Sequence, residues 1–183
     1  MITQQARTSL DRMVEHGLRN AWPSSSDGQV VIEQVDGVQP APGSHMVVLM
    51  LASHTFRLVI VLYVAGDRAT QSYLQRVGRI TPGDLSQQAF LDSISESGNM
   101  CCGTVNRELG RFYRSTGMST PHIIDSRSAW YLDGMKHEHM RHFRIEVDGA
   151  VFQASLCASA EREMDFEWQP EAEPETAGEL EFF

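Results

Sequence analysis

Two acids and one amide recur at helical spacing in the segment Phe90 to Tyr113, which reads FLDSISESGNMCCGTVNRELGRFY. At about 100° per residue, Asp92, Glu96 and Asn99 fall on one side of a helical wheel. Residues three positions apart on a helix have Cβ atoms about 5–6 Å apart, so Glu96 and Asn99 can reach the same small group on a partner. This spacing indicates a polar helical face directed at another molecule.

An apolar stripe lies opposite the polar face on the same wheel. Its members recur every three or four residues: Ile94, Gly98, Cys101, Val105, Leu109 and Phe112. Such a stripe is typical of a helix packed on a core, so the polar face is expected to be exposed. Gly103 and Gly110 lie on the polar side, where the lack of side chains would let another protein's backbone come close.

The polar face carries a pattern that extends beyond the helix. The pattern is D-x3-E-x2-N, and its asparagine, Asn99, begins the further pattern N-M-x-x-G. Twenty-one residues lie between Asn99 and Pro121. This pattern resembles the signature of the CheC/CheX/FliY chemotaxis phosphatases, bacterial proteins that dephosphorylate response regulators. Glu96 and Asn99 match the pair inserted into the regulator's phosphorylation site, Asp92 the leading position, Gly103 the family glycine and Pro121 the distal proline. A single copy of the motif favours the CheX-like arrangement over the two-site CheC arrangement.

The resemblance implies an aspartyl-phosphate phosphatase that acts on a CheY-like receiver domain. Hydrolysis of an acyl phosphate by water needs positioning and electrostatics more than covalent chemistry. Asn99 would hold the attacking water, since a carboxamide both accepts and donates hydrogen bonds without carrying charge. Glu96 would clamp the lysine beside the phosphoryl group. The protein would need no cofactor of its own, Mg²⁺ would belong to the receiver domain, and a homodimer is implied by the resemblance alone.

Three features depart from the family pattern, one of which is that Cys101 and Cys102 replace small or aliphatic residues. Thr104 stands where the family usually has a second asparagine, and the spacing to Pro121 is one residue short. These last two features leave an alternative open: a non-catalytic signalling adaptor that binds a receiver domain or a motor-switch protein through the same helix face.

The charge of the chain is concentrated at its C-terminal end. The 183 residues carry a net charge of −9, and residues 161–183 contribute −8 of it through nine acids and one arginine. The rest is nearly neutral, so a nucleic-acid partner is not expected. No apolar run approaches the ~20 residues that span a bilayer, and the first residues lack a signal or transit pattern. We therefore expect a cytoplasmic protein without a membrane partner.

The order of the expected elements predicts an α+β domain. Helices are expected over residues 4–19 with Thr3 as N-cap, over 67–77, and over the motif segment with Asp84 as N-cap. For the motif segment, Pro82 and Gly98 leave two helices or one kinked helix open. Strands are expected over residues 30–38, 45–52, 55–64, 120–125, 142–147 and 150–158. Short links favour antiparallel neighbours, and Asp148-Gly149 predicts a tight hairpin turn. These elements indicate two layers, a largely antiparallel sheet with the long helices packed on one face.

The expected domain covers residues 1–160, as a CheX-like phosphatase domain. Residues 161–183 are expected to be a flexible tail that mixes acids with aromatic residues such as Phe166 and Trp168. Two interpretations of the tail remain open, a solvated terminus and an interaction segment that docks on a partner or on the chain's own body.

Two other residue clusters are candidates for functional sites, and neither pattern favours one. His137, Glu138 and His139 could offer two imidazoles and a carboxylate to a metal, but Lys136 and Arg141 add repulsive charge and no second cluster is close in sequence. We therefore expect no metal site. The vicinal Cys101 and Cys102 are expected to be reduced packing residues on the motif helix.

Overall fold

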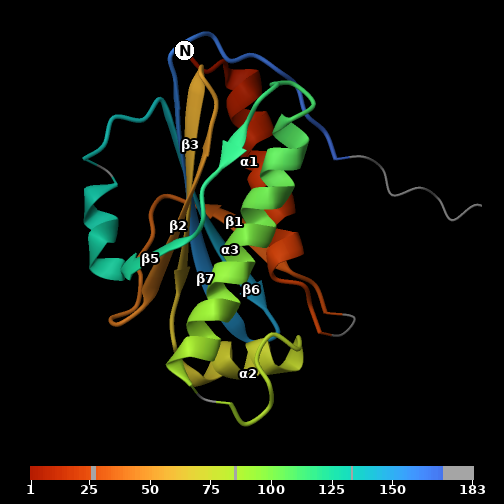
Figure 1. Cartoon of the computed structure of the whole chain (residues 1–183), viewed down its shortest axis with the longest axis vertical. Helices are drawn as coiled ribbons and strands as arrows, with labels where there is room; N and C mark the ends of the chain where they lie inside the picture. The colour runs from red at the N-terminus through yellow and green to blue at the C-terminus, as the bar shows by residue number, and fades with distance from the viewer. Residues whose placement is uncertain (26–27, 85, 133, 171–183) are drawn as a thin grey trace, which may run out of the picture.

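A computed structural model describes residues 1–25, 28–84, 86–132 and 134–170. It has a seven-stranded sheet with the two long helices packed on one face (Figure 1). The helices are α1 (Gln4–Ala21), α2 (Arg68–Arg76), α3 (Gln87–Leu109) and the short 3-10 helix η1 (Ser126–Tyr131). The strands are β1 (Val31–Val35), β2 (His45–Ala52), β3 (Phe56–Val64), β4 (Gly117–Met118), β5 (His122–Asp125), β6 (His139–Val147) and β7 (Ala150–Ala160). The predicted two-layer α+β class is confirmed.

The strands of the sheet pair antiparallel in the order β1-β6-β7-β3-β2-β4, and β5 also pairs with β2. β6 and β7 form the predicted hairpin, in which Val147 lies opposite Ala150. Asp148 and Gly149 make the turn with φ angles of 48° and 82°. Both angles lie in the left-handed region that a two-residue hairpin turn requires. The local sequence signal for this hairpin is therefore confirmed.

The first strand has a different neighbour from the one predicted. Its short link to the next strand favoured pairing with β2, but β1 pairs with β6 instead, with Val31 opposite Glu146. β2 and β3 are antiparallel neighbours, as predicted. Residues 36–44 carry the chain from the β1 edge across the sheet to β2. The prediction for β1 was wrong because link length alone does not decide which strand lies beside it.

α1 and α3 lie side by side on one face of the sheet (Figure 1). Thr3 caps α1 as predicted, because its side chain accepts a hydrogen bond from the Ala6 N–H at 3.2 Å. The two helices and the sheet share one core, which includes Leu10, Val14, Leu18, Leu49, Leu62, Ile94, Val105, Leu109 and Phe152. Within the described residues, no helix combines the length and the apolar character that crossing a membrane requires.

α3 is one continuous helix. Ser86 is its N-cap instead of the predicted Asp84, since the Ser86 side chain accepts from the Ala89 N–H at 3.2 Å. The helix ends at Leu109. The predicted stripe member Phe112 consequently lies beyond the helix and is 41% exposed.

The inner face of α3 packs closely on β2. A Cβ atom at Gly98 would lie 2.7 Å from Leu49 Cδ1 and 3.0 Å from Val47 Cγ1, so a larger residue would force these side chains or the helix to shift. Cys101 and Cys102 are free and buried on the same helix. Burial raises the pKa of both thiols, that of Cys102 to about 12. The two cysteines are therefore neutral packing residues.

The chain continues to pack beyond residue 160. Three hydrophobic side chains of this segment are buried in the same core as α1 and α3: Met164, Phe166 and Trp168. Met164 also forms a parallel bridge with Ile2. The packed body thus extends past the boundary predicted at residue 160, because these side chains alternate with charged ones and cover the helices. Residues 171–183 of the predicted tail lie outside the described residues.

Candidate functional site

The outer face of α3 brings three of the predicted site residues together. Asp92 and Glu96 are exposed, and Asn99 is half-buried. Asn99 Nδ2 donates a hydrogen bond to Glu96 Oε2 at 3.5 Å, so the amide and the carboxylate lie next to each other at the surface. Asp92 lies one turn earlier and accepts from Gln88 Nε2 at 2.7 Å. A carboxylate and a carboxamide are therefore available to an approaching molecule.

The other two motif residues lie beside this face. A Cβ atom at Gly103 would have no atom within 4 Å outside its own helix turn, so the surface next to Asn99 is open there. Pro121 is half-buried and directly precedes β5. The segment that joins β4 to β5 runs along α3 (Figure 1). Pro121 thus belongs to a neighbouring segment and not to the helical face itself.

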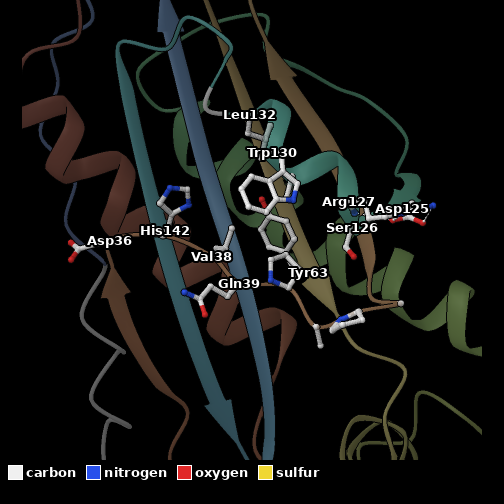
Figure 2. A pocket seen from close by; sticks show the side chains of 16 residues that line it. Asp36, Val38, Gln39, Tyr63, Asp125, Ser126, Arg127, Trp130, Leu132 and His142 are labelled. Carbon is white, nitrogen blue, oxygen red and sulfur yellow. Dashed lines mark hydrogen bonds and ion pairs between the residues drawn. The ribbon is translucent and has the colours of Figure 1, made fainter.

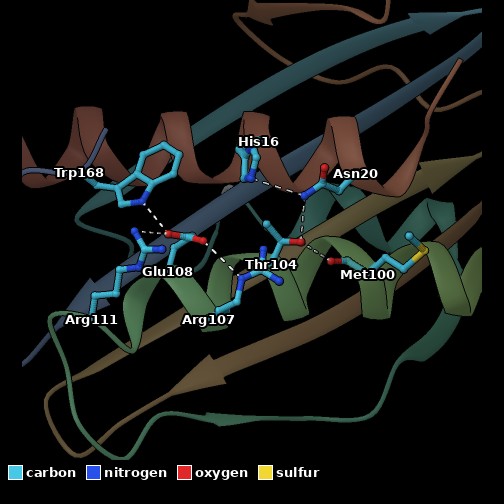
Figure 3. A network of polar contacts seen from close by, with 8 residues as sticks. All are labelled: His16, Asn20, Met100, Thr104, Arg107, Glu108, Arg111 and Trp168. Atoms are coloured by element: carbon cyan, nitrogen blue, oxygen red, sulfur yellow. Dashed lines mark hydrogen bonds and ion pairs between the residues drawn. The ribbon is translucent and has the colours of Figure 1, made fainter. Parts of the chain in front are cut away.

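Thr104, the residue that departs from the family pattern, points away from this face and toward α1. It is buried, and its hydroxyl donates to the Met100 carbonyl at 3.0 Å (Figure 3). The same oxygen accepts from Asn20 Nδ2 of α1 at 3.3 Å. A side chain at position 104 therefore affects the contact between α1 and α3 and does not enter the surface that carries Glu96 and Asn99.

Arg79 lies next to the motif residues, although the sequence analysis did not single it out. Its Nη1 donates to Ser97 Oγ at 2.5 Å, and its Nη2 lies 3.0 Å from Met100 Sδ. Both partners belong to α3, whereas Arg79 belongs to the connection between α2 and α3. One local signal for the position of Arg79 is Gly78, the residue directly before it. Gly78 has the positive φ angle that is typical of a glycine after a helix C-terminus, here that of α2.

The histidine cluster has a structural role in the packing of α1 on the sheet. His139 Nε2 lies 2.6 Å from Asp11 Oδ1, and Arg141 Nε donates to Asp11 Oδ2 at 3.0 Å. Asp11 and His139 are both buried. Across the described ranges, no group of three or more His, Cys, Asp or Glu side chains is arranged to hold a metal ion. His139 therefore joins α1 to β6 through a buried polar contact with Asp11.

A pocket lies on the other side of the sheet. It has a volume of about 830 Å³ and lies between residues 36–43 and η1, with Tyr63 and His142 of the sheet among its lining residues (Figure 2). Trp130 at this pocket is 84% exposed. Tyr63 packs in a cluster separate from the core under α3. The pocket is consequently not part of the surface that carries Glu96 and Asn99.

Comparison of the sequence alone gives no relative: no family model matches the chain, and no match is found among curated proteins. Comparison of the structure, in contrast, finds similar proteins. The chemotaxis protein CheX from Vibrio vulnificus has a TM-score of 0.60 at 13% sequence identity, over 82% of this chain and 99% of that one. A CheC-like superfamily protein from Shewanella sp. PV-4 has a TM-score of 0.59 at 11% identity, over 82% of this chain and 97% of that one.

A third similar structure is the complex of CheX with CheY, BeF3 and Mg²⁺ from Borrelia burgdorferi. Its matching chain has a TM-score of 0.55 at 12% identity, over 82% of this chain and 96% of that one. The matches span nearly the whole length of each of these proteins, so they concern the entire domain. The chain therefore has the fold of the CheX and CheC-like chemotaxis proteins.

Proposed function

We propose that this protein is a phosphatase that accelerates hydrolysis of the aspartyl phosphate of a response-regulator receiver domain. One observation carries the proposal: Glu96 and Asn99 lie side by side at the surface of a rigid helix, 3.5 Å apart, with an open surface at Gly103 beyond them. The motif spacing and the shared fold with CheX proteins support the same function.

Asn99 and Glu96 would act by positioning. Asn99 would accept a hydrogen bond from the attacking water and hold it in line with the phosphorus atom, because an amide stays neutral while doing so. Glu96 would pair with the lysine beside the phosphoryl group and so hold the two proteins in register. Mg²⁺ would be held by the receiver domain and not by this chain. No covalent intermediate on this protein is required.

We also propose a partner, a cellular compartment and an oligomeric state for this protein. A solved structure of the same fold contains CheX together with CheY, BeF3 and Mg²⁺, which supports a CheY-like receiver as the partner. The protein would then act in the cytoplasm, where it would meet receiver domains. The resemblance to CheX supports a homodimer, which sedimentation of the purified protein would test.

The proposal is tested by phosphate release from phosphorylated receiver domains. Wild-type protein is expected to accelerate release, and Asn99→Ala is expected to reduce that acceleration by about 10²- to 10³-fold while the receiver still binds. Gln87→Ala is the matched control, since it removes an exposed amide from the first turn of the same helix. Its rate should equal that of the wild type.

A non-catalytic adaptor would behave differently in the same assay. It would bind the receiver domain through α3 without changing the rate of hydrolysis, and Asn99→Ala would alter only the affinity. Such a result with several receiver domains would replace the phosphatase proposal by the adaptor.

A further inference from the structure

The end of α2 directs Arg79 toward α3. Gly78 has a φ of 73°, and the Arg79 N–H donates to the Leu74 carbonyl at 2.9 Å. This hydrogen bond spans five residues and follows a glycine in the left-handed region, as in a Schellman motif at a helix C-terminus. The backbone at Arg79 is therefore held firmly, and its side chain extends from a defined point.

The guanidinium of Arg79 connects three elements. It donates to Ser97 Oγ at 2.5 Å on α3, to the Ala21 carbonyl at 2.6 Å at the end of α1, and it lies 3.0 Å from Met100 Sδ. Ser97 is fully buried and donates its own proton to the Ser93 carbonyl at 3.1 Å. The Ser97 oxygen can therefore accept the hydrogen bond from Arg79. The planar guanidinium of an arginine carries several N–H groups in fixed directions, so it can donate to α3 and to the end of α1 at the same time.

The contacts of Arg79 fall next to the proposed catalytic residues. Ser97 directly follows Glu96 in the chain, and Met100 directly follows Asn99. Burial lowers the pKa of Arg79, whereas attraction to Tyr73 and to Glu96 favours its charged form. An arginine remains protonated at neutral pH. A fixed positive charge consequently lies behind the face that carries the carboxylate and the amide.

We propose that Arg79 is a positioning residue of this face: its guanidinium holds the middle of α3 against α1 and so sets the direction of Glu96 and Asn99. This role rests on the proposed phosphatase function. A displacement of about 1 Å at a reacting group can cost about 10²-fold in rate. Loss of Arg79 should therefore affect the chemical step more than the binding of the receiver domain.

The test compares Arg79→Gln with Arg76→Gln. Arg76 is the last residue of α2, three positions before Arg79, but it is exposed and donates to the Asp148 carbonyl at 2.6 Å, away from α3. Arg79→Gln is expected to lower kcat for phosphate release by about 10- to 100-fold with little change in KM, and Arg79→Lys should not restore it. Arg76→Gln should match the wild type. A folded Arg79→Gln protein with unchanged kcat, or with a changed KM alone, would overturn the inference.

Two further measurements test the role of Arg79 if Arg79→Gln does not fold or if the wild type is inactive. If Arg79→Gln does not fold, Ser97→Ala removes the acceptor on α3 and keeps the arginine, and it should lower kcat in the same direction. If the wild type itself releases no phosphate, the proposed function fails and amide hydrogen exchange then decides the role of Arg79. Exchange of residues 96–103 should be about tenfold faster in Arg79→Gln than in Arg76→Gln. Equal exchange in the two variants would contradict the positioning role.

Discussion

The indole of Trp168 donates its Nε1–H to the buried carboxylate of Glu108 at 3.0 Å (Figure 3). This hydrogen bond joins the C-terminal segment to the last turns of α3. Arg111 lies 3.2 Å from the same carboxylate oxygen, so Glu108 has both a neutral and a charged donor. The segment that follows β7 is thereby fastened to the helix that carries the proposed site.

Replacement of Trp168 should destabilise the whole domain. Trp168→Ala removes a ring that is 3% exposed and is expected to lower the free energy of unfolding by about 3–5 kcal/mol. Trp168→Phe keeps most of the packing but leaves Glu108 without its indole donor, at a cost of about 1–3 kcal/mol. Urea denaturation measures both. Trp130→Phe is the control, because Trp130 is 84% exposed and should change stability by less than about 0.5 kcal/mol.

Alanine at the two glycines of α3 should have opposite effects. In Gly98→Ala the new Cβ would meet Leu49 and Val47 on β2 at 3.0 Å or less, so a net loss of about 1 kcal/mol is expected despite the better helix propensity. In Gly103→Ala no neighbour is within 4 Å, and stability should rise by about 0.5–1 kcal/mol. Thermal unfolding of both variants checks the pair. A stabilised Gly98→Ala protein would mean that α3 lies farther from the sheet.

The stability of the protein should depend on Glu108 at low pH. Burial by itself raises the pKa of Glu108, but the hydrogen bond from Trp168 and the attraction of Arg111 and Arg107 bring it below the ordinary value of 4.5. Because the pKa is lower in the folded state, this contribution is complete above the unfolded pKa and is lost as the pH falls through the folded one.

Urea midpoints between about pH 6 and about pH 3 measure this dependence. The wild type is expected to lose stability more steeply over this range than Glu108→Gln, which cannot titrate at this position. Parallel pH profiles for the two proteins would show that Glu108 contributes nothing to the dependence.

Introducing at position 104 the asparagine of the CheC/CheX/FliY pattern should not improve catalysis. Thr104→Asn places a larger side chain between α1 and α3, so we expect a loss of about 1–3 kcal/mol in unfolding free energy. The rate of phosphate release per folded molecule should stay unchanged, since Thr104 points away from Glu96 and Asn99. Thr104→Ser keeps the hydroxyl and serves as the control. A rate increase in Thr104→Asn would show that position 104 reaches the partner.

Local sequence patterns were sufficient for several elements. The 3.6-residue period predicted α3 and the position of Glu96 and Asn99 opposite the apolar stripe, because a helix places residues three and four positions apart on one face. Thr3 and the Asp148-Gly149 turn were equally predictable, since a cap or a tight turn involves only a few consecutive residues. The fold class followed from these elements, while the catalytic roles of Glu96 and Asn99 stay predictions.

The tertiary structure alone decided the contacts between distant residues. Neither the pairing of β1 with β6 nor the contact of Trp168 with Glu108 has a local signal in the chain, and Gly78 signals only the end of α2, not that Arg79 lies behind the motif face. Each depends on how separately formed elements pack, and many packings satisfy the same periodicity. The sequence by itself determined which side of α3 is polar; packing against α1, β2 and the C-terminal segment determined how firmly that face is held.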